Sequence, residues 1–366
     1  MEVLEGAQEL ERAGDDVIHL EVGEPDFPTP EPVVDAGTRA LRDGLTHYTH
    51  SLGILPLREA IAERTLRDSG VAVDPGQIVV TSGTSSAMLI TFAALCDPGD
   101  QVILTDPHYA CYPNFLKTLS VEPVYVPVDP EDGYAIDPGR VRAAMTPRTK
   151  ALLINSPANP MGAVLSDDNL AALADLDLTI VSDEIYRGIE YGGQSSSMMR
   201  FREDTVLLDG FSKRYCMTGW RLGYVVAPRR LMKPLQALQQ NLFISAAEFV
   251  QHAGLAALRD DVQDHVSKMV VELGTRRRAM IDGARDLGLG VAREPEGAFY
   301  LFADASHLGP HSLAVTRRIL AEAKVAVAPG LDFGERGEGF LRLAYTQKTE
   351  RIQEALDRIR RLLESW

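Results

Sequence analysis

Residues 206–226, VLLDGFSKRYCMTGWRLGYVV, hold two short apolar runs, at 206–208 and 224–226, on either side of a polar segment with one lysine and two arginines. Such runs are apolar on successive residues, which is typical of strands covered on both faces of a sheet. Five similar runs precede them, separated by segments of helix length. They lie at residues 78–80, 102–104, 124–126, 152–154 and 178–181. The pattern predicts an α/β core with a mostly parallel seven-stranded sheet and helices on both faces.

The C-terminal third of the sequence predicts a smaller α+β unit, because strand and helix patterns are mixed there. It follows a long helical stretch from about Met232 to Asp286, in which Gly254 and the acidic pair 260–261 are the expected breaks. The strand patterns lie at 299–302, 325–328 and 340–345, and the helix patterns lie at 312–323 and 350–364.

The two ends of the chain are expected to share this smaller unit. Residues 1–43 have no sheet-sized pattern of their own. Within them, Thr29 is the expected N-cap of a helix that begins at Pro30. We therefore expect a large domain over residues 44–280 and a small domain formed by residues 1–43 and 281–366.

The composition is that of an acidic globular chain. Its 366 residues include 37 basic and 52 acidic side chains, for a net charge of −15. That balance disfavours nucleic-acid binding, which needs clustered lysine and arginine. The first residues lack the basic and apolar order of a secretory signal, and the longest apolar run, 87–96, is roughly half of the ~20 residues that span a bilayer. The 3 cysteines indicate neither a disulfide framework nor a metal site, so we expect a cytoplasmic protein without membrane or nucleic-acid partners.

Ligands of an open parallel sheet bind beyond the carboxyl ends of its strands, so the residues that follow each run are candidates. Residues 82–86, SGTSS, open a helical stretch whose free N–H groups suit an anion. Asn159 is held extended by Pro160, with its amide free to donate. Asp183 ends a buried strand and needs a partner, either a helix cap or a cationic ligand nitrogen. Taken singly, each of these features is also explained by a cap or a turn.

Three cations are candidates of the same kind. Lys213, just past a buried strand, is either solvated or, when desolvated, a nucleophile for carbonyl groups. Arg221, between two glycines, has the fork geometry that binds phosphate or carboxylate. Arg342 lies in a strand pattern, where it is either solvated at an edge or turned inward onto an anion, and the sequence alone favours the edge.

In combination, these motifs resemble the class I aminotransferases of pyridoxal-phosphate fold type I, especially the branch of bacterial aspartate aminotransferases and their relatives. The resemblance extends from Gly23 to Arg342. Five ordered motifs at family-like spacing make a chance match implausible. These are NPxG at 159–162, DEIY at 183–186, SK with MTGWR at 212–221, PEGAFY at 295–300 and LRL at 341–343. The resemblance implies the fold type I architecture, with pyridoxal 5'-phosphate as the cofactor.

The resemblance also implies roles around the cofactor ring. Lys213 matches the lysine that forms the internal aldimine and later shuttles the proton. Asp183 matches the carboxylate that keeps the pyridine nitrogen protonated, so that the ring acts as an electron sink. Asn159 and Tyr186 match the groups that bind the phenolate oxygen, and Tyr109 matches the aromatic residue stacked on the ring.

The cofactor phosphate has its own set of matching residues. Gly83, Thr84 and Ser85 would hold it at a helix N-terminus, and Ser212 and Arg221 would lie opposite. Some aspartate aminotransferases of this branch carry a lysine where Ser85 stands. The absence of that lysine leaves a preference for dicarboxylate substrates without support.

The remaining matches concern the substrate and a second subunit. Arg342 matches the arginine that takes the substrate α-carboxylate, and Asn159 lies beside the substrate as well. Gly23 lies in the N-terminal segment that closes over the substrate. Tyr48 matches a tyrosine that reaches the phosphate of the neighbouring subunit, so the resemblance implies a homodimer with shared sites.

The implied activity is transfer of the amino group of an L-amino acid to a 2-oxo acid by a ping-pong mechanism. A lyase or synthase of the same fold, such as a C–S lyase or a cyclising biosynthetic enzyme, keeps the same cofactor groups and stays an alternative. A non-catalytic regulatory domain that binds the cofactor is disfavoured, because the match begins by about residue 19 and leaves no room for a DNA-binding segment. A Rossmann dehydrogenase is disfavoured because no glycine fingerprint follows the first core run.

Overall fold

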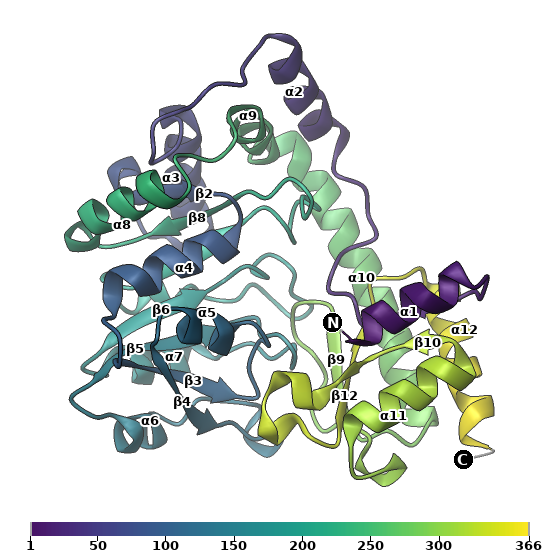
Figure 1. The fold of residues 1–366 in the computed structure, drawn as a ribbon. Helices are drawn as coiled ribbons and strands as arrows, with labels where there is room; N and C mark the ends of the chain where they lie inside the picture. The colour runs from purple at the N-terminus through teal and green to yellow at the C-terminus, as the bar shows by residue number, and fades with distance from the viewer. Residues whose placement is uncertain (1, 365–366) are drawn as a thin grey trace.

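The computed structural model describes residues 2–364, and the seven predicted runs form the seven strands of its central sheet (Figure 1). The strand order is β2-β8-β7-β6-β5-β3-β4, in which β8 is antiparallel to both neighbours and the other pairs are parallel. The prediction of a mostly parallel seven-stranded sheet is confirmed. The strands are β2 Ile78–Thr81, β3 Gln101–Asp106, β4 Glu122–Pro127, β5 Thr149–Asn155, β6 Thr179–Asp183, β7 Val206–Gly210 and β8 Gly223–Val226.

Helices cover both faces of this sheet, because successive strand residues face opposite sides. On one face, Val79, Leu153 and Leu208 pack with α4, α5 and α8. On the other face, Ile78 and Leu207 pack with α3, α9 and α10, while β3, β5 and β6 pack with α6 and α7. Burial of each such side chain stabilises the fold by roughly 1.5–3 kcal/mol. The helices of these two layers are α3 Leu55–Ser69, α4 Thr84–Leu95, α5 Tyr112–Thr118, α6 Pro138–Ala144, α7 Asp167–Ala174, α8 Arg229–Leu242, α9 Glu248–Ala257 and α10 Asp260–Asp286.

The reversed strand β8 brings three loops to one edge of the sheet. Thr81 at the end of β2 and Gly210 at the end of β7 both pair with Gly223 at the start of β8. The backbone is tightly packed at this point, because a Cβ on Gly223 would lie 2.7 Å from the backbone nitrogen of Thr84. The loop after β2, the loop after β7 and the approach to β8 therefore meet at the carboxyl edge.

The two ends of the chain lie side by side beyond the sheet (Figure 1). Strand β1 pairs in parallel with β10, and a three-stranded antiparallel sheet has β12 between β11 and β9. The long helix α10 runs through residue 280, so the expected boundary at 280/281 falls inside a helix and stays a prediction. The elements beyond the sheet are α1 Glu2–Arg12, β1 Ile18–His19, β9 Tyr300–Asp304, α11 Ser312–Arg318, β10 Val325–Ala326, β11 Ala328–Pro329, β12 Phe340–Ala344 and α12 Thr349–Leu363. Helix α2 Glu31–Arg42 lies apart from them and packs against α9 (Figure 1).

Two local predictions are wrong. Gly254 is not a break but lies inside α9, where the absence of a side chain makes room for Leu222, and the break falls at residues 243–247. Thr29 does not cap a helix, because its hydroxyl donates to the carbonyl of Cys216 at 2.6 Å, and Pro30 takes the N-cap position of α2. The predicted break at 260–261 is correct, since α10 begins there.

Within residues 2–364, we find no helix that is both long and apolar enough to cross a membrane. The same part of the chain contains no group of three or more histidine, cysteine, aspartate or glutamate side chains that could hold a metal ion.

Candidate active site

A cavity of about 370 Å³ lies at the carboxyl edge of the central sheet, facing β9 and β12. All but two of the predicted site residues line it. They are Gly23, Thr84, Ser85, Tyr109, Asn159, Asp183, Tyr186, Ser212, Lys213, Arg221 and Arg342. The two exceptions are Gly83 and Tyr48. The topology therefore brings residues from both chain ends and from five loops of the core into one space.

Lys213 lies in the loop after β7, and its Nζ donates a hydrogen bond to the carbonyl oxygen of Gly23 at 2.7 Å. Burial lowers the pKa of Lys213 to about 8, and the nearby positive charges of Arg342 and Arg221 act in the same direction. The neutral amine is therefore far more populated near neutral pH than in an ordinary lysine, although the protonated form still predominates below pH 8. A neutral amine in a polar cavity is a nucleophile for carbonyl carbons and a base for C–H protons.

Asp183 is the last residue of β6 and is 4% exposed. Its Oδ2 accepts a hydrogen bond from the hydroxyl of Tyr112 at 2.8 Å, and its Oδ1 accepts one from the backbone of Ile185 at 3.2 Å. Burial raises the pKa of Asp183 to about 6, against the opposing effect of these hydrogen bonds. A buried carboxylate of this kind is stabilised by a cation placed beside it in the cavity. Tyr112 is a site residue that the sequence analysis missed.

The start of α4 and Arg221 form an anion-binding end of the cavity. Gly83 caps the helix with φ +84°, and a Cβ there would lie 2.6 Å from Nη2 of Arg221. The missing side chain therefore lets the guanidinium lie against the first turn of the helix. Arg221 itself has φ +55°, and its Nη1 donates to the carbonyl of Thr218 at 3.1 Å. Helix N–H groups and an arginine side by side are suited to a phosphate.

Arg342 is on the middle strand of the three-stranded sheet and is 7% exposed, so the expectation of a solvated edge position is wrong. Its guanidinium carbon lies 4.4 Å from the centre of the Tyr300 ring and 4.7 Å from that of Phe333. Nη1 donates to Oδ1 of Asn159 at 3.0 Å, and Nη2 donates to the carbonyl of Glu21. Nε is buried and has no partner within residues 2–364. The arginine is thus turned inward, with a donor left over for an anion.

Tyr186 and Tyr300 share a hydrogen bond between their hydroxyl oxygens at 2.9 Å. Burial raises the pKa of Tyr186 well above its usual value, so the phenol stays protonated and is able to donate. Tyr300 ends the PEGAFY motif at 295–300, but the sequence analysis gave it no role of its own. A Cβ on Gly23 would collide with its hydroxyl, which is why the N-terminal segment needs glycine at this point.

The segment that carries Gly23 is held beside the cavity by contacts with two other parts of the chain. The carboxylate of Glu24 accepts a hydrogen bond from the hydroxyl of Thr218. From α10, Arg276 donates to Asp26 at 2.6 Å, and its guanidinium lies 4.6 Å from the centre of the Phe27 ring. The segment therefore forms one wall of the cavity next to Lys213.

Tyr48 lies outside the cavity of its own chain and is 83% exposed. Its neighbours are anchored at the start of α9 and just before it, since the backbone N–H groups of His47 and Thr49 donate to Glu248 at 2.8 Å and Ser245 at 3.3 Å. An exposed aromatic ring is therefore held on an ordered surface segment.

Comparisons with known proteins find aminotransferases that are similar to this chain over nearly its whole length. The profile of the family described as aminotransferase class I and II matches residues 15–359. The (5-formylfuran-3-yl)methyl phosphate transaminase of Methanocaldococcus jannaschii is 38% identical over 99% of this chain and 96% of that protein. The aspartate/prephenate aminotransferase of Thermus thermophilus is 41% identical over 98% of this chain and 94% of that protein. The crystal structure of Thermus thermophilus aspartate aminotransferase with maleate has a TM-score of 0.95 at 40% identity, covering 98% of this chain and 95% of that chain.

Proposed function

The chain belongs to the class I and II aminotransferases and is a pyridoxal-phosphate-dependent enzyme that moves an amino group from an amino acid to a 2-oxo acid; we propose that the cavity described above is its active site. One observation carries this proposal. A desolvated lysine, a buried carboxylate and two arginines converge on a single cavity. The fold type I architecture supplies the frame that brings them together.

The cavity residues fit pyridoxal phosphate in charge and in shape. Asp183, whose pKa is raised by burial, gains a partner when a protonated ring nitrogen lies beside it. The first turn of α4 and Arg221 suit the phosphate dianion, with Ser212 close by in the same lining. Tyr109 adds an aromatic ring to the cavity wall, against which a flat ring can stack.

When bound, pyridoxal phosphate supplies a carbonyl carbon that takes up the amino group and a ring that accepts the electron pair left at the substrate Cα. Asp183 holds the proton on the ring nitrogen. Oδ1 of Asn159 is engaged by Arg342, so its Nδ2 is free to donate to the ring oxygen together with the Tyr186 hydroxyl. Lys213 Nζ, in its neutral form, removes the proton from the substrate Cα.

The substrate α-carboxylate binds to Arg342 in this proposal. Arg342 supports it because it lines the cavity as a buried cation, and a carboxylate beside it would supply the opposite charge. Gly23 closes the space next to this carboxylate. No further lysine or arginine lines the cavity within residues 2–364, so the chain itself offers no cation to a second carboxylate of the substrate.

We further propose a homodimer in which Tyr48 reaches the phosphate of the neighbouring site. The exposed ring of Tyr48 supports this arrangement, as do Leu242 and Ile244, which are 54% and 44% exposed close to the anchored segment 47–49. Exposed apolar side chains that gather on one surface favour association. Size-exclusion chromatography with light scattering tests the dimer, and mixed dimers of Tyr48→Phe and Lys213→Ala chains test the sharing of sites.

Two other expectations stay part of the proposal. The division into residues 44–280 and 1–43 with 281–366 is supported by the pairing of β1 with β10, which joins the two chain ends. A cytoplasmic location is supported by the free state of Cys96, Cys111 and Cys216.

The deciding experiment is a half-reaction. Enzyme loaded with pyridoxal phosphate is mixed with single L-amino acids in the absence of a 2-oxo acid, and the released oxo acid and ammonia are counted per site. We expect one oxo acid per site at most and no free ammonia, because the amino group stays on the enzyme. Continuous release of oxo acid with ammonia would show the lyase alternative instead.

A further inference from the structure

Each of the two central residues is followed in sequence by a charged residue that faces away from the cavity. Asp183 is followed by Glu184, and Lys213 is followed by Arg214. Neither Glu184 nor Arg214 lines the active-site cavity. Arg214 instead lines a small second cavity of about 20 Å³ together with Asp68, and neither Lys213 nor Asp183 lines this one. The loops after β6 and β7 therefore share a charged layer behind the cavity. It is formed by Asp68, Glu184, Arg187 and Arg214.

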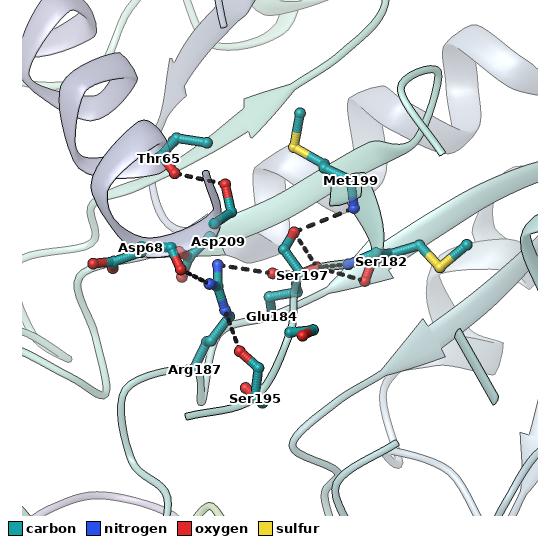
Figure 2. A network of polar contacts seen from close by, with 12 residues as sticks. Thr65, Asp68, Ser182, Glu184, Arg187, Ser195, Ser197, Met199 and Asp209 are labelled. Carbon is teal, nitrogen blue, oxygen red and sulfur yellow. Dashed lines mark hydrogen bonds and ion pairs between the residues drawn. The ribbon is translucent and has the colours of Figure 1, made fainter. Parts of the chain in front are cut away.

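Glu184 is fixed in this layer by several donors (Figure 2). The side chain is 2% exposed, and its Oε1 accepts hydrogen bonds from Ser182 at 3.1 Å and Ser197 at 2.9 Å. Its Oε2 pairs with Nη1 of Arg187 at 3.4 Å. Because Glu184 is bonded directly to Asp183 in the chain, these contacts fix the backbone that carries the Asp183 carboxylate.

Asp68, at the end of α3, joins the two loops. Its backbone carbonyl accepts a hydrogen bond from Nη2 of Arg187 at 2.6 Å (Figure 2). Its Oδ2 accepts hydrogen bonds from Arg214 at 2.8 Å and from Arg64 at 2.7 Å. Asp68 thus contacts both loops. It binds Arg187, which pairs with Glu184 next to Asp183, and it binds Arg214, which is next to Lys213.

The fit between the two loops is tight. Gly188 has φ +90°, and a Cβ there would lie 2.7 Å from the guanidinium carbon of Arg214. Arg214 therefore packs directly against the residue next to Arg187, so the positions of the two loops are coupled here. The side chains of Asp68 and Arg214 are only 14% and 17% exposed, so water is a poor substitute for their ion pair.

We propose that Asp68 is a positioning residue that fixes Lys213 relative to Asp183 by holding Arg214 and Arg187 together behind the active site. This inference rests on the roles proposed above for Lys213 and Asp183. Asp68 does not touch substrate or cofactor. Its effect reaches the reaction through the geometry of the two loops, where a displacement of about 1 Å is enough to slow a reaction strongly.

The test is the isosteric variant Asp68→Asn in the holoenzyme, which keeps the backbone acceptor for Arg187 and removes the carboxylate that binds Arg214. We expect kcat to fall about tenfold or more, while KM for the amino donor changes less than about twofold, because Arg342 is untouched. The visible circular dichroism of the bound cofactor is expected to change in amplitude, since it reports the orientation of the ring in its site. Asp68→Glu should restore part of both signals.

The matched control is Asp129→Asn. Asp129 also binds two arginines, Arg140 at 2.9 Å and Arg336, and its side chain is 21% exposed, but it lies outside the cavity lining. Loss of thermal stability in both variants, with kcat and dichroism unchanged in Asp68→Asn, would overturn the inference and leave Asp68 with a purely structural role. If Asp68→Asn does not fold, Arg214→Lys applies the same test from the other side of the pair. Failure of the proposed site itself is distinct, because Lys213→Ala would then keep the cofactor absorbance.

Discussion

In the proposed active site, the two ends of the cavity offer anions two different kinds of binding group. Arg221 is an exposed loop residue that lies against the first turn of α4 and shares its ligand with helix N–H groups. Arg342 is buried in the middle strand of a sheet, between the rings of Tyr300 and Phe333. The proposal therefore gives the phosphate several modest contributions that share its charge, and gives the substrate carboxylate one desolvated cation. The comparison indicates that the two ends differ in their tolerance of substitution.

Lys213 lies between the two ends, so its removal is expected to have the largest effect. Lys213→Ala should abolish the visible absorbance that depends on this amine and lower kcat/KM by about 10⁴-fold or more, because the nucleophile and the base are lost together. Absorbance spectra and steady-state rates check this. Lys150→Ala, which removes a surface lysine 3.5 Å from Asp100, is the control and should retain full activity. Normal transamination by Lys213→Ala would contradict the assignment of the site.

At the buried end, Arg342→Ala should lower kcat/KM on the order of 100-fold for every amino acid alike, because each presents the same α-carboxylate. Arg342→Lys should recover little, since an ammonium group does not reproduce the fork or the stacking between two rings. A donor panel with KM values measures both variants. An effect confined to acidic donors would show that the arginine binds another group.

At the exposed end, Arg221→Ala should raise the dissociation constant for pyridoxal phosphate only about tenfold, because α4 and Ser212 remain. Arg221→Lys should recover most of that loss, since a lysine keeps the positive charge while the helix N–H groups keep their share of the phosphate. Equilibrium dialysis of the cofactor gives the constants. Equal sensitivity of Arg221 and Arg342 to the lysine substitution would break the contrast between the two ends.

The smallest predicted effect is one of pH. In the cofactor-free protein, carbamylation of Lys213 by cyanate should rise with pH around a midpoint near 8, because burial lowers the pKa of this amine to about 8 from 10.5. The folded lysine then holds fewer protons than the unfolded one between these values, so its contribution to the free energy of unfolding increases with pH in that window. Peptide mapping at several pH values measures the midpoint. A midpoint near that of ordinary lysines would show that the cavity does not desolvate the amine.

The sequence predicted the parts of this molecule that depend on local pattern. The seven apolar runs became the seven strands, and the polar residues after them reached one edge because parallel strands end together. The position of Arg342 was not predictable in the same way, since an isolated strand pattern does not reveal which strand lies in the middle of a sheet.

The missed residues share a different cause. Tyr112 contacts Asp183 across 71 positions, and Tyr300 contacts Tyr186 across 114. Asp68 meets Arg214 across 146 positions. Contacts at such separations are set by the packing of whole elements. In the sequence, Tyr112 and Asp68 resemble ordinary helix residues, and Tyr300 belongs to a motif that does not reveal its partner. The sequence motifs contain the residues proposed to contact the ligand, but they assign no role to the residues that position those side chains.

The reversal of β8 has a consequence for how the chain assembles. Gly223 pairs with Gly210 through the short segment that separates β7 from β8, whereas its other partner, Thr81, must come from far along the chain. The conformational entropy of closing a loop grows with its length, so the first pairing costs less than the second. Lys213 and Arg221 both lie within the short loop, and local chain connectivity alone brings them to one edge. The later pairing of β2 with β8 brings in the first turn of α4, which is the other half of the proposed phosphate site.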